Sequence, residues 1–588
     1  LGLKAIGLAK GDVIAIISDN IPELLFTAIG AHSIGAISAG IYQTSMPAEI
    51  AQIIQYLKVS AVFCDNQEQV DKVLDVRDQI PNVKKVIFED PRGMRDYMSD
   101  DWFIDIRDLY KMGEEEHAKN PDIFEALVDE GKPDDVCHLC LTSGTTGLPK
   151  GTKLTHKNYI NMGVQLIQVD PLESTDEYVS FLPFAWIGEQ MNSFGVAMAS
   201  GITLNFPESV ETAMSDLKEI GPHFMFGAPR IYETIRSQIW LKIDQSYWLN
   251  KVFYNYFIKV GIESAGYKMT GKPMPLGLKI KSWLGTQLIF RPLVNQIGFL
   301  RLRRAYTGGA ALGPELFTFY QAIGVNLKQI YGQTEIVGIA YMHRDGDVRP
   351  ETVGKPLPGT TCKISELGEI LSRSDSVTPG YYDLPEKSEE LLEGGWLHSG
   401  DAGFIDENGH LVVIDRLSDV MHNNKDEMFS PMFLENALKF SRYIKEAVIY
   451  GNKEDFVACL INIDPIVVGK WAEDRGISFS TYMDLSGKPE VAQLMMEQVL
   501  DVNSRAEKEH FKIKRFALLY KLLDTDDGEL TKTGKIRRKF VQERYQNLYD
   551  SLYDESVDKK EVEASFQYQD GQSTKVKTSI AFYTVKGA

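Results

Sequence analysis

Short apolar runs rich in β-branched residues alternate with helical patterns along the first four hundred residues. Residues 59–64 and 85–88 are two such runs, and each has the length and composition of a buried strand. Strands that alternate with helices predict parallel sheets covered by helices, and therefore an α/β fold. The most apolar stretch, residues 21–42, contains Glu23, His32 and several glycines. We interpret it as a pair of buried helices and not as a membrane span.

Residues 236–300 depart from this pattern because Trp, Tyr, Phe and Lys are frequent there. The aromatic residues are spaced as on one face of a helix: Trp240, Tyr247, Trp248, Phe253, Tyr254, Tyr256 and Phe257. In a soluble protein such a face is usually core. Two other interpretations stay open, the wall of an apolar tunnel and a membrane-contact patch. The second would draw on nearby lysines, namely Lys242, Lys251, Lys259 and Lys268.

The pattern changes again near Asp415. Residues 447–450 and 457–462 read as two strands of a second, smaller α/β domain. Further on, Asp570-Gly571 lies between alternating segments and predicts a β-hairpin in the C-terminal tail. We therefore predict three parts: a large N-terminal domain (1–414), a small C-terminal lid domain (415–549) and a tail (550–588).

Length, charge and cysteine content exclude several classes of protein. A chain of 588 residues exceeds what one core supports, so at least two domains are expected. The net charge of −19 argues against a nucleic-acid partner, which requires a basic face. No apolar run is long enough for a membrane-spanning helix. Five scattered cysteines indicate a reducing compartment, and Cys137 and Cys140 are expected to pack in a strand because no second pair completes a zinc site.

Residues 141–151 carry the strongest chemical signal in the chain. This stretch combines hydroxyls, glycines and a lysine: Thr142, Ser143, Gly144, Thr145, Thr146, Gly147, Lys150 and Gly151. Glycines permit close backbone approach, consecutive N–H groups form an anion-binding concavity, and hydroxyls and lysine add donors. The apolar run 136–141 precedes it, so the loop is expected at a strand end, where α/β proteins hold phosphates. The order of residues is not the Walker pattern, and it disfavours a merely flexible loop.

Six ordered motifs resemble the adenylate-forming superfamily, which includes acyl-CoA synthetases, luciferases and the adenylation domains of peptide synthetases. They are the 141–151 loop, Thr307-Gly-Gly-Ala-Ala311, Tyr331-Gly-Gln-Thr-Glu335, Gly380-Tyr-Tyr-Asp-Leu-Pro-Glu386, Gly395-Trp-Leu-His-Ser-Gly-Asp401 with Asp415-Arg416, and Thr531-Lys-Thr-Gly-Lys-Ile-Arg-Arg538. The resemblance extends from the first residues to about Tyr549. The family's usual leading segment is missing, so we expect a truncated N-terminus.

The resemblance implies the activation of a carboxylic acid with ATP and Mg²⁺, followed by transfer of the acyl group to coenzyme A. It also implies the adenylate-forming fold, in which parallel-rich sheets form the large domain and the small lid is mobile. Because an anion must attack a polyanion, catalysis is expected to rest on positioning and electrostatic stabilisation. Lys535 would occupy the position of the lysine that bridges the α-phosphate and the attacking carboxylate. An ammonium is a compact, mobile charge that suits a site assembled by lid closure.

By the same resemblance, the segment from Thr142 to Gly147 would wrap the β- and γ-phosphates with support from Lys150. Glu335 and Thr142 would hold Mg²⁺, which prefers oxygen ligands. Tyr331 would stack on adenine, and Thr334 would touch the α-phosphate. The remaining nucleotide contacts would come from the backbone of Gly308, Gly309, Ala310 and Gly332, from Asp401 on the ribose hydroxyls, and from Arg416 at the hinge.

The residues expected near the acyl pocket and at the hinge depart from the family's motifs. Trp186, in Phe181-Leu-Pro-Phe-Ala-Trp186, stands where the family commonly has histidine, and it would shape or gate the pocket or act as a packed core aromatic. Arg230 matches a family turn near the same pocket. The hinge also departs from the family: Ser418 replaces a lysine, and Lys425-Asp426 stand where glycines are expected, which puts the CoA half-reaction in question.

These motifs predict a long-chain fatty acid–CoA ligase. The choice of the long-chain branch rests on the aromatic segment, on Trp186 and on the run from Ile289 to Arg304. Two alternatives stay open, a fatty acyl-AMP ligase that loads a carrier protein and a degenerate nucleotide-binding homologue. Expected partners are the fatty acid, ATP and CoA. We expect a cytoplasmic location, with peripheral contact to the inner face of a membrane as an option.

Overall fold

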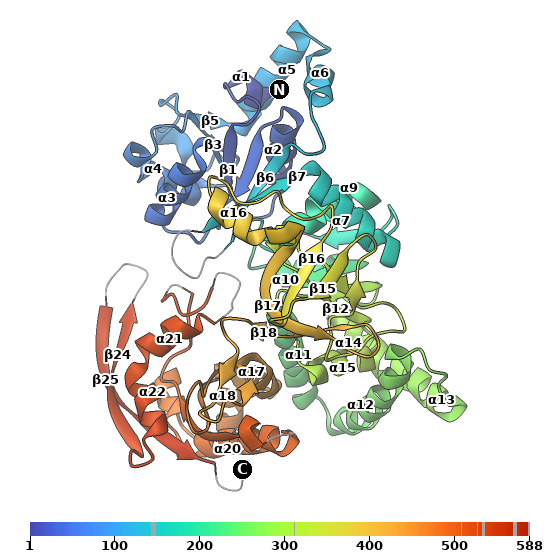
Figure 1. The fold of residues 1–588 in the computed structure, drawn as a ribbon, viewed down its shortest axis with the longest axis vertical. Coiled ribbons are helices and arrows are strands. Elements are labelled where there is room, and N and C mark those ends of the chain that lie inside the picture. The colour runs from blue at the N-terminus through green and yellow to red at the C-terminus, as the bar shows by residue number, and fades with distance from the viewer. Residues whose placement is uncertain are drawn as a thin grey trace.

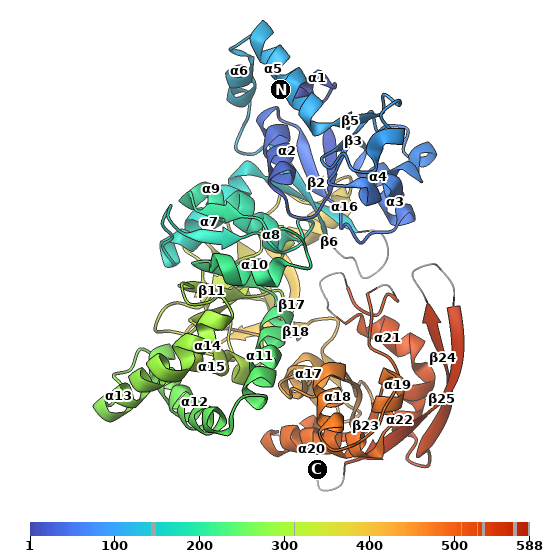
Figure 2. The same ribbon diagram turned by 180° about the vertical axis from the view of Figure 1, so that it is seen from behind.

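The computed structural model describes residues 1–142, 149–310, 312–506, 509–525, 527–531, 536–567 and 573–585. Two sheet-containing parts follow one another along the long axis of the molecule, and a C-terminal part lies beside the second of them (Figure 1). The view from behind shows the same arrangement, with helices on the outer faces of the sheets (Figure 2). The predicted α/β fold with a smaller C-terminal domain is confirmed.

The first sheet has the strand order β5-β4-β3-β1-β2-β6-β7. Its strands are β1 (Val13–Ile17), β2 (Ile37–Gly40), β3 (Val59–Cys64), β4 (Lys85–Phe88), β5 (Phe103–Asp105), β6 (Val136–Thr142) and β7 (Lys150–Thr155). All neighbours pair in parallel except β6 and β7, which are antiparallel. The strands predicted over 59–64 and 85–88 are confirmed as β3 and β4, and they are buried because helices cover both faces of a parallel sheet.

The helix pair predicted over residues 21–42 is wrong. One helix forms, α2 (Pro22–Ser33), and the second half becomes strand β2. Gly35 takes a φ of 72° directly after the helix, a conformation that ends it at little cost for glycine. The short run that follows then pairs with β1 and is buried in the sheet.

The second sheet has the order β14-β13-β12-β11-β10-β8-β9. Its strands are β8 (Glu177–Val179), β9 (Thr203–Asn205), β10 (Phe224–Gly227), β11 (Arg304–Thr307), β12 (Leu327–Tyr331), β13 (Tyr341–Met342) and β14 (Lys355–Pro356). Lys328 on β12 is fully buried and pairs with Asp170 at 2.6 Å and with Asp345 at 2.7 Å. The Tyr306 hydroxyl also donates to Asp170, at 2.6 Å. This paired charge fixes β11 and β12 against the C-terminal end of helix α7 (His156–Val169), which Asp170 follows.

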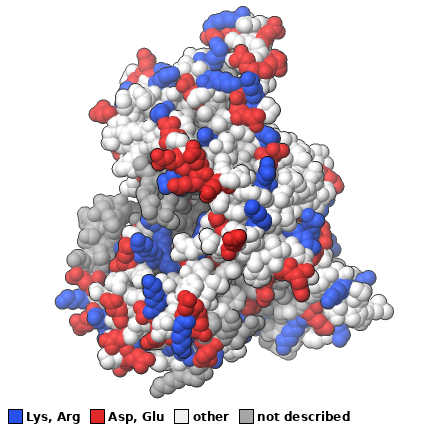
Figure 3. All heavy atoms as spheres, viewed as in Figure 1, with Lys and Arg blue, Asp and Glu red and all other residues white. Residues whose placement is uncertain are grey.

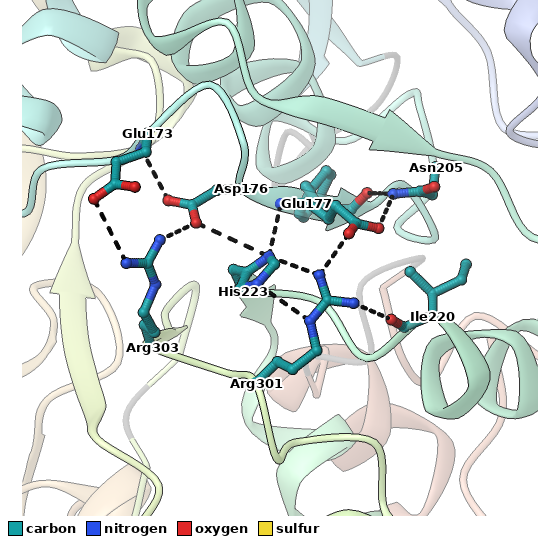
Figure 4. A network of polar contacts seen from close by, with 9 residues as sticks. Glu173, Asp176, Glu177, Asn205, Ile220, His223, Arg301 and Arg303 are labelled. Atoms are coloured by element: carbon teal, nitrogen blue, oxygen red, sulfur yellow. Dashed lines mark hydrogen bonds and ion pairs between the residues drawn. The ribbon is translucent and has the colours of Figure 1, made fainter.

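A network of polar side chains lies at the end of this sheet where β8 and β10 begin (Figure 4). Arg301 pairs with Glu177 at 2.5 Å, and Arg303 pairs with the buried Asp176. His223 lies between the two arginines and accepts the Glu177 backbone N–H at 3.1 Å, and burial lowers its pKa. The arginines of the 301–304 run therefore join strand ends through ion pairs.

The expectation that the aromatic segment packs in the core is wrong for most of its aromatic residues. The segment forms α11 (Pro229–Asp244), α12 (Trp248–Met269) and α13 (Leu276–Gly285). Tyr254 and Phe257 are buried, but four other aromatic side chains are half or more exposed: Tyr247, Trp248, Phe253 and Tyr256. Helices α12 and α13 project from the body of the molecule in both views (Figure 1, Figure 2).

A third, antiparallel sheet leads to the C-terminal domain. It contains β15 (Thr361–Ile364), β16 (Glu369–Arg373), β17 (Leu397–Ile405) and β18 (Leu411–Arg416). The C-terminal domain has a five-stranded sheet in the order β21-β22-β23-β25-β24. Its strands are β21 (Ile444–Tyr450), β22 (Val457–Ile463), β23 (Ile513–Leu518), β24 (Lys559–Gln567) and β25 (Ser573–Thr584).

The tail belongs to this C-terminal sheet. Strands β24 and β25 pair antiparallel, and β25 continues beside β23 with Phe516 opposite Tyr583. Arg515 is buried on β23, and its guanidinium donates to the carbonyl oxygens of Ser551 at 3.0 Å and Leu552 at 3.2 Å. The buried arginine thus satisfies the end of helix α22 (Gln546–Tyr553), directly before the tail begins.

Two further expectations concern membrane-spanning helices and the cysteine pair. Within the described ranges, no helix is long and apolar enough to cross a membrane. Cys137 and Cys140 are buried, unbridged residues of β6, and burial raises the pKa of both thiols. The interpretation of this pair as core packing is confirmed.

Candidate active site

The sequence motifs meet where β7, the edge strand of the first sheet, runs beside residues 378–382. The backbone N–H of Lys153 donates to the Gly380 carbonyl at 3.0 Å, and that of Tyr382 donates to the Gly151 carbonyl at 2.8 Å. Thr378 donates its backbone N–H to the Glu335 carbonyl at 2.8 Å. This seam brings together three motifs that span more than two hundred residues of the chain.

Glu335, Tyr381 and Lys150 form one cluster at the seam. The Tyr381 hydroxyl donates to Glu335 Oε1 at 2.7 Å, and Lys150 Nζ lies 4.8 Å from the centre of the Tyr381 ring. Glu335 is buried in the short helix η5 (Thr334–Ile336). Burial and the Glu335 carboxylate raise the pKa of Tyr381, so its hydroxyl stays a donor across physiological pH. The cluster offers a fixed carboxylate next to an ammonium group.

A second cluster joins Tyr331, Asp401 and Arg416. The Tyr331 hydroxyl donates to Asp401 Oδ2 at 2.7 Å, and Arg416 Nε lies 3.0 Å from Asp401 Oδ1. Asp401 and Arg416 are opposite residues of the antiparallel strands β17 and β18, so the sheet register sets their contact. Arg416 also donates to the Ser399 carbonyl at 3.1 Å. Burial and the Asp401 carboxylate raise the pKa of Tyr331.

The two clusters act on the same cation. Burial opposes the charge of Arg416, but Asp401, Tyr331 and Glu335 together raise its pKa. The guanidinium is therefore charged at any physiological pH, although its side chain remains about half exposed. A partly exposed, permanently charged guanidinium between two carboxylates can contact a phosphate or ribose oxygen of a bound nucleotide.

Glycines of the 307–311 turn create space beside Trp186. Gly309 has a φ of 84°, and a Cβ there would lie 3.3 Å from the Trp186 indole. At Gly308 a Cβ would lie 2.6 Å from the Ile330 side chain, so this glycine is required by packing on β12. The Trp186 ring stacks on Phe226 with centroids 5.4 Å apart. The half-buried indole thus borders the same turn that the sequence assigns to the nucleotide.

A buried carboxylate supports the segment that carries Trp186. Glu189 accepts hydrogen bonds from Tyr178 at 2.8 Å, from Ser180 and Ser193 at 2.7 Å each, and from the Leu182 N–H at 3.3 Å. Burial raises the pKa of Glu189 to about 7. These four donors connect the end of β8 with the π-helix Met191–Val196, so the carboxylate fixes the loop that leads to Trp186.

Part of the predicted site lies outside the described residues. This applies to Ser143, Gly144, Thr145, Thr146 and Gly147 of the glycine-rich loop, and to Lys535. The two ends of the loop are described: Thr142 and Lys150 are opposite residues of β6 and β7, and the Thr142 hydroxyl donates to the Lys150 carbonyl at 3.3 Å. The loop therefore connects two antiparallel strands.

The basic run after Lys535 is not a freely solvated patch. Arg538 forms a bidentate ion pair with Glu435 and donates to the Ile449 carbonyl at 3.0 Å. The Glu435 carboxylate raises the pKa of Arg538 against the effect of burial. Arg538 thus anchors the segment that follows Lys535 to β21 and α17 (Pro431–Lys439).

Arg230 lies in a different place from the two clusters. It is an exposed residue of the first turn of α11 and lines a cleft of about 120 Å³ between the large and C-terminal domains. Lys439 and Glu446 of the C-terminal domain line the same cleft. The role of Arg230 in acyl binding stays a prediction, as do the roles of the other site residues.

The hinge turn has the backbone strain that its sequence suggests. Asp426 has a φ of 64°, whereas Lys425 is not among the residues with positive φ. The Asn423 side chain holds the turn by accepting the N–H groups of Lys425 and Glu427 at 2.9 Å each. A non-glycine residue therefore occupies a left-handed position, at a cost of about 1 kcal/mol.

The residues present fit Mg²⁺ by their donor chemistry. Glu335 offers a carboxylate whose orientation is fixed by Tyr381, and Thr142 offers a hydroxyl. Among the described residues, no group of three or more His, Cys, Asp or Glu side chains could hold a metal ion. Mg²⁺ bound with a nucleotide usually takes one or two protein oxygens and completes its shell with phosphate and water.

Sequence reasoning gave no role to Tyr381, Ser399 or Glu189. Tyr381 stands inside a quoted motif, and its tyrosine pair Tyr381-Tyr382 was the available signal. Ser399 contributes its carbonyl oxygen, which no side-chain pattern reveals. Glu189 follows Trp186 closely in an apolar stretch, where a lone acid is a signal for a buried carboxylate.

Comparison with known families matches both domains. The model of the AMP-binding enzyme family matches residues 1–382, and that of the AMP-binding enzyme C-terminal domain matches residues 418–557. The long-chain-fatty-acid–CoA ligase ACSBG1 of Rattus norvegicus is 26% identical over 585 residues, which cover 94% of this chain and 80% of the relative. The long-chain-fatty-acid–CoA ligase FadD15 of Mycobacterium bovis is 26% identical over 551 residues, which cover 93% and 88%.

Solved structures superpose on most of this chain. The adenylation domain of a carboxylate reductase from Mycobacterium chelonae superposes with a TM-score of 0.70 at 18% identity, and 94% of this chain and 82% of that chain are covered. The anthranilate CoA ligase AuaEII in complex with anthranoyl-AMP gives a TM-score of 0.65 at 18% identity, with 93% and 90% covered. At these identities the likeness establishes the fold alone.

We predict that Glu189 makes stability depend on pH near neutrality. Its pKa is raised to about 7 in the folded protein, against about 4.3 in an unfolded chain. The folded state therefore binds the proton more tightly, and the stabilisation present at low pH is lost as the pH rises from about 4.5 to 7. The melting temperature of the wild type minus that of Glu189→Gln should decrease over this range. Exposed Glu389→Gln should track the wild type, and a constant difference for Glu189→Gln would contradict the assignment.

Proposed function

Because the chain belongs to the AMP-binding enzyme family, we propose that it activates a long-chain fatty acid with ATP and transfers the acyl group to coenzyme A. The carrying observation is the pair of side-chain clusters, one formed by Glu335, Tyr381 and Lys150 and the other by Tyr331, Asp401 and Arg416. The Glu335 carboxylate of the first cluster also stabilises the charge of Arg416 in the second. These groups present the charges that a nucleoside triphosphate requires: ammonium and guanidinium for phosphates, and a carboxylate for ribose hydroxyls.

In the first proposed step, a carboxylate oxygen of the fatty acid attacks the α-phosphorus of ATP. The bond to pyrophosphate breaks, and an acyl-adenylate remains. Asp401 would accept hydrogen bonds from the ribose, while Lys150 would neutralise the β- and γ-phosphates. When bound, Mg²⁺ would supply further positive charge between Glu335, Thr142 and the phosphates. Tyr381 would keep the Glu335 carboxylate in one orientation by donating to Oε1.

Lys535 would serve this step by bridging the carboxylate and the α-phosphate. In the second proposed step, the thiol of coenzyme A attacks the acyl carbonyl carbon and AMP leaves. The preference for long chains is supported by the names of the relatives and by Trp186, whose indole borders both the turn 307–311 and Phe226. An acyl-AMP ligase that loads a carrier protein remains the second candidate, because the hinge turn departs from the glycine pattern.

Pyrophosphate release with a series of acids, with and without CoA, tests this function. If Trp186 lines an apolar pocket, each added CH₂ contributes up to about 0.8 kcal/mol, so kcat/KM should rise steeply from C4 towards long chains and then level. Trp186→Ala should flatten this slope, and Phe26→Ala, at a surface aromatic residue, should leave it unchanged. A preference for acetate or aromatic acids would refute the long-chain assignment, and CoA-independent turnover of a carrier protein would favour the second candidate.

Lys535 should act in the first half-reaction alone. Its charge contacts groups that carry extra negative charge in the adenylation transition state, so Lys535→Ala should slow acyl-adenylate formation by roughly three orders of magnitude or more. The variant should still convert a synthetic acyl-adenylate and CoA to product. Lys539→Ala, in the same basic run, is the matched control and should retain both half-reactions. Intact ATP-dependent activation by Lys535→Ala would remove this residue from the mechanism.

The hinge turn should limit the second half-reaction. Asp426 holds a left-handed conformation and adds a side chain where the family resemblance predicts glycine. We expect Asp426→Gly to raise the rate of thioester formation several-fold while the adenylation rate stays the same. Lys425→Gly lies next to it without a positive φ and should change neither rate. Equal effects of Asp426→Gly on both half-reactions would show that the turn tolerates aspartate without functional consequence.

A further inference from the structure

Residues 247–291 form a helical hairpin with exposed apolar side chains that the proposed reaction does not use. Helix α12 carries Trp248, Val252 and Tyr256 one turn apart, with Leu249 and Phe253 beside them. All five side chains are between 40% and 59% exposed. The opposite side of α12 packs through Tyr254 and Phe257, so the exposed stripe is a second apolar surface on a helix that is already packed.

Helix α13 carries a similar stripe. Leu276, Ile280, Trp283 and Leu284 lie at intervals of three and four residues and are 73%, 53%, 60% and 39% exposed. The other side of α13 contacts α12, where the Ser282 hydroxyl donates to Ser264 at 3.1 Å. Each helix therefore packs against the other through one face and exposes apolar side chains on another face. Exposed patches of this size usually mark an interaction surface.

The charge of the hairpin opposes that of the rest of the chain. Residues 247–291 contain seven Lys or Arg residues and one acidic residue, Glu263, whereas the whole chain has a net charge of −19. Lys259, Lys279 and Lys281 are exposed and flank the apolar stripes. On the face shown in Figure 3, blue side chains lie among uncharged surface where α12 and α13 project. Basic residues beside exposed tryptophans favour an anionic, partly apolar partner.

We propose that the hairpin 247–291 docks the protein onto an anionic lipid bilayer. Tryptophan, tyrosine and leucine side chains enter the boundary between headgroups and acyl chains, while lysines bind the negatively charged headgroups. Charge complementarity favours an anionic partner, because the hairpin carries seven Lys or Arg residues against one acidic residue, and exposed tryptophans beside those lysines suit the headgroup boundary of a bilayer. The proposal does not depend on the proposed reaction.

Flotation with vesicles tests the proposal. The protein should float with vesicles of phosphatidylcholine and phosphatidylglycerol, bind phosphatidylcholine alone much more weakly, and dissociate at high salt. Trp248→Ser/Phe253→Ser and Lys279→Glu/Lys281→Glu should each lower partitioning by at least about tenfold. Leu367→Ser/Phe433→Ser is the matched control, because both side chains are exposed apolar residues outside the hairpin, and it should bind as the wild type does.

A second measurement tests the proposal without polar substitutions, so its result does not depend on whether the serine and glutamate variants fold. Brominated phospholipids should quench tryptophan fluorescence of the wild type, and Trp248→Phe/Trp283→Phe should float normally but lose most of that quenching. Failure of the wild type to float with anionic vesicles would overturn the proposal. So would quenching that persists without Trp248 and Trp283, or a dimer in sedimentation velocity that the hairpin variants dissociate, since a second copy would then occupy the surface.

Discussion

The antiparallel seam between β7 and residues 378–382 is the constraint on which the candidate site depends. Strand β7, the edge strand that follows the glycine-rich loop, donates the Lys153 N–H to the Gly380 carbonyl and accepts the Tyr382 N–H at the Gly151 carbonyl. Thr378 donates its backbone N–H to the Glu335 carbonyl. Without this seam, Lys150, Glu335 and Tyr381 would belong to three separate structural units. Backbone hydrogen bonds give the seam a fixed register, so the side chains meet with little freedom left to lose when a ligand binds.

The charge at the candidate site differs from the net charge of the chain, which is −19. The chain as a whole repels anions, yet the site places Lys150 over the Tyr381 ring and Arg416 beside Asp401. These contacts hold both cations in position without a ligand. The same separation of charge recurs at the surface, where the basic hairpin 247–291 projects from an acidic body.

The two domains meet through contacts that a rotation of the lid would have to break. On α11, Arg236 donates to the Phe440 carbonyl at 2.8 Å, and Trp240, one turn later, lies under the Arg442 guanidinium at 3.2 Å from the ring centre. Trp240 also packs against the core of the C-terminal domain. The strained Asp426 lies in the turn between β19 (Met421–His422) and β20 (Met428–Phe429), close to the point where the chain enters that domain.

The sequence by itself determined the fold class, the family and strands β3, β4 and β6 of the first sheet, because alternating apolar runs and ordered motifs are local signals. Only the tertiary structure decided which residues share a site: Tyr381 reaches Glu335 across the seam, and Arg416 reaches Asp401 through strand register. It also reversed two expectations. The second half of residues 21–42 became a strand because a partner strand was available, and the aromatic face of α12 became surface because its other face was already packed. Apolar periodicity shows that a face needs a partner, but the partner is fixed only when the chain has folded.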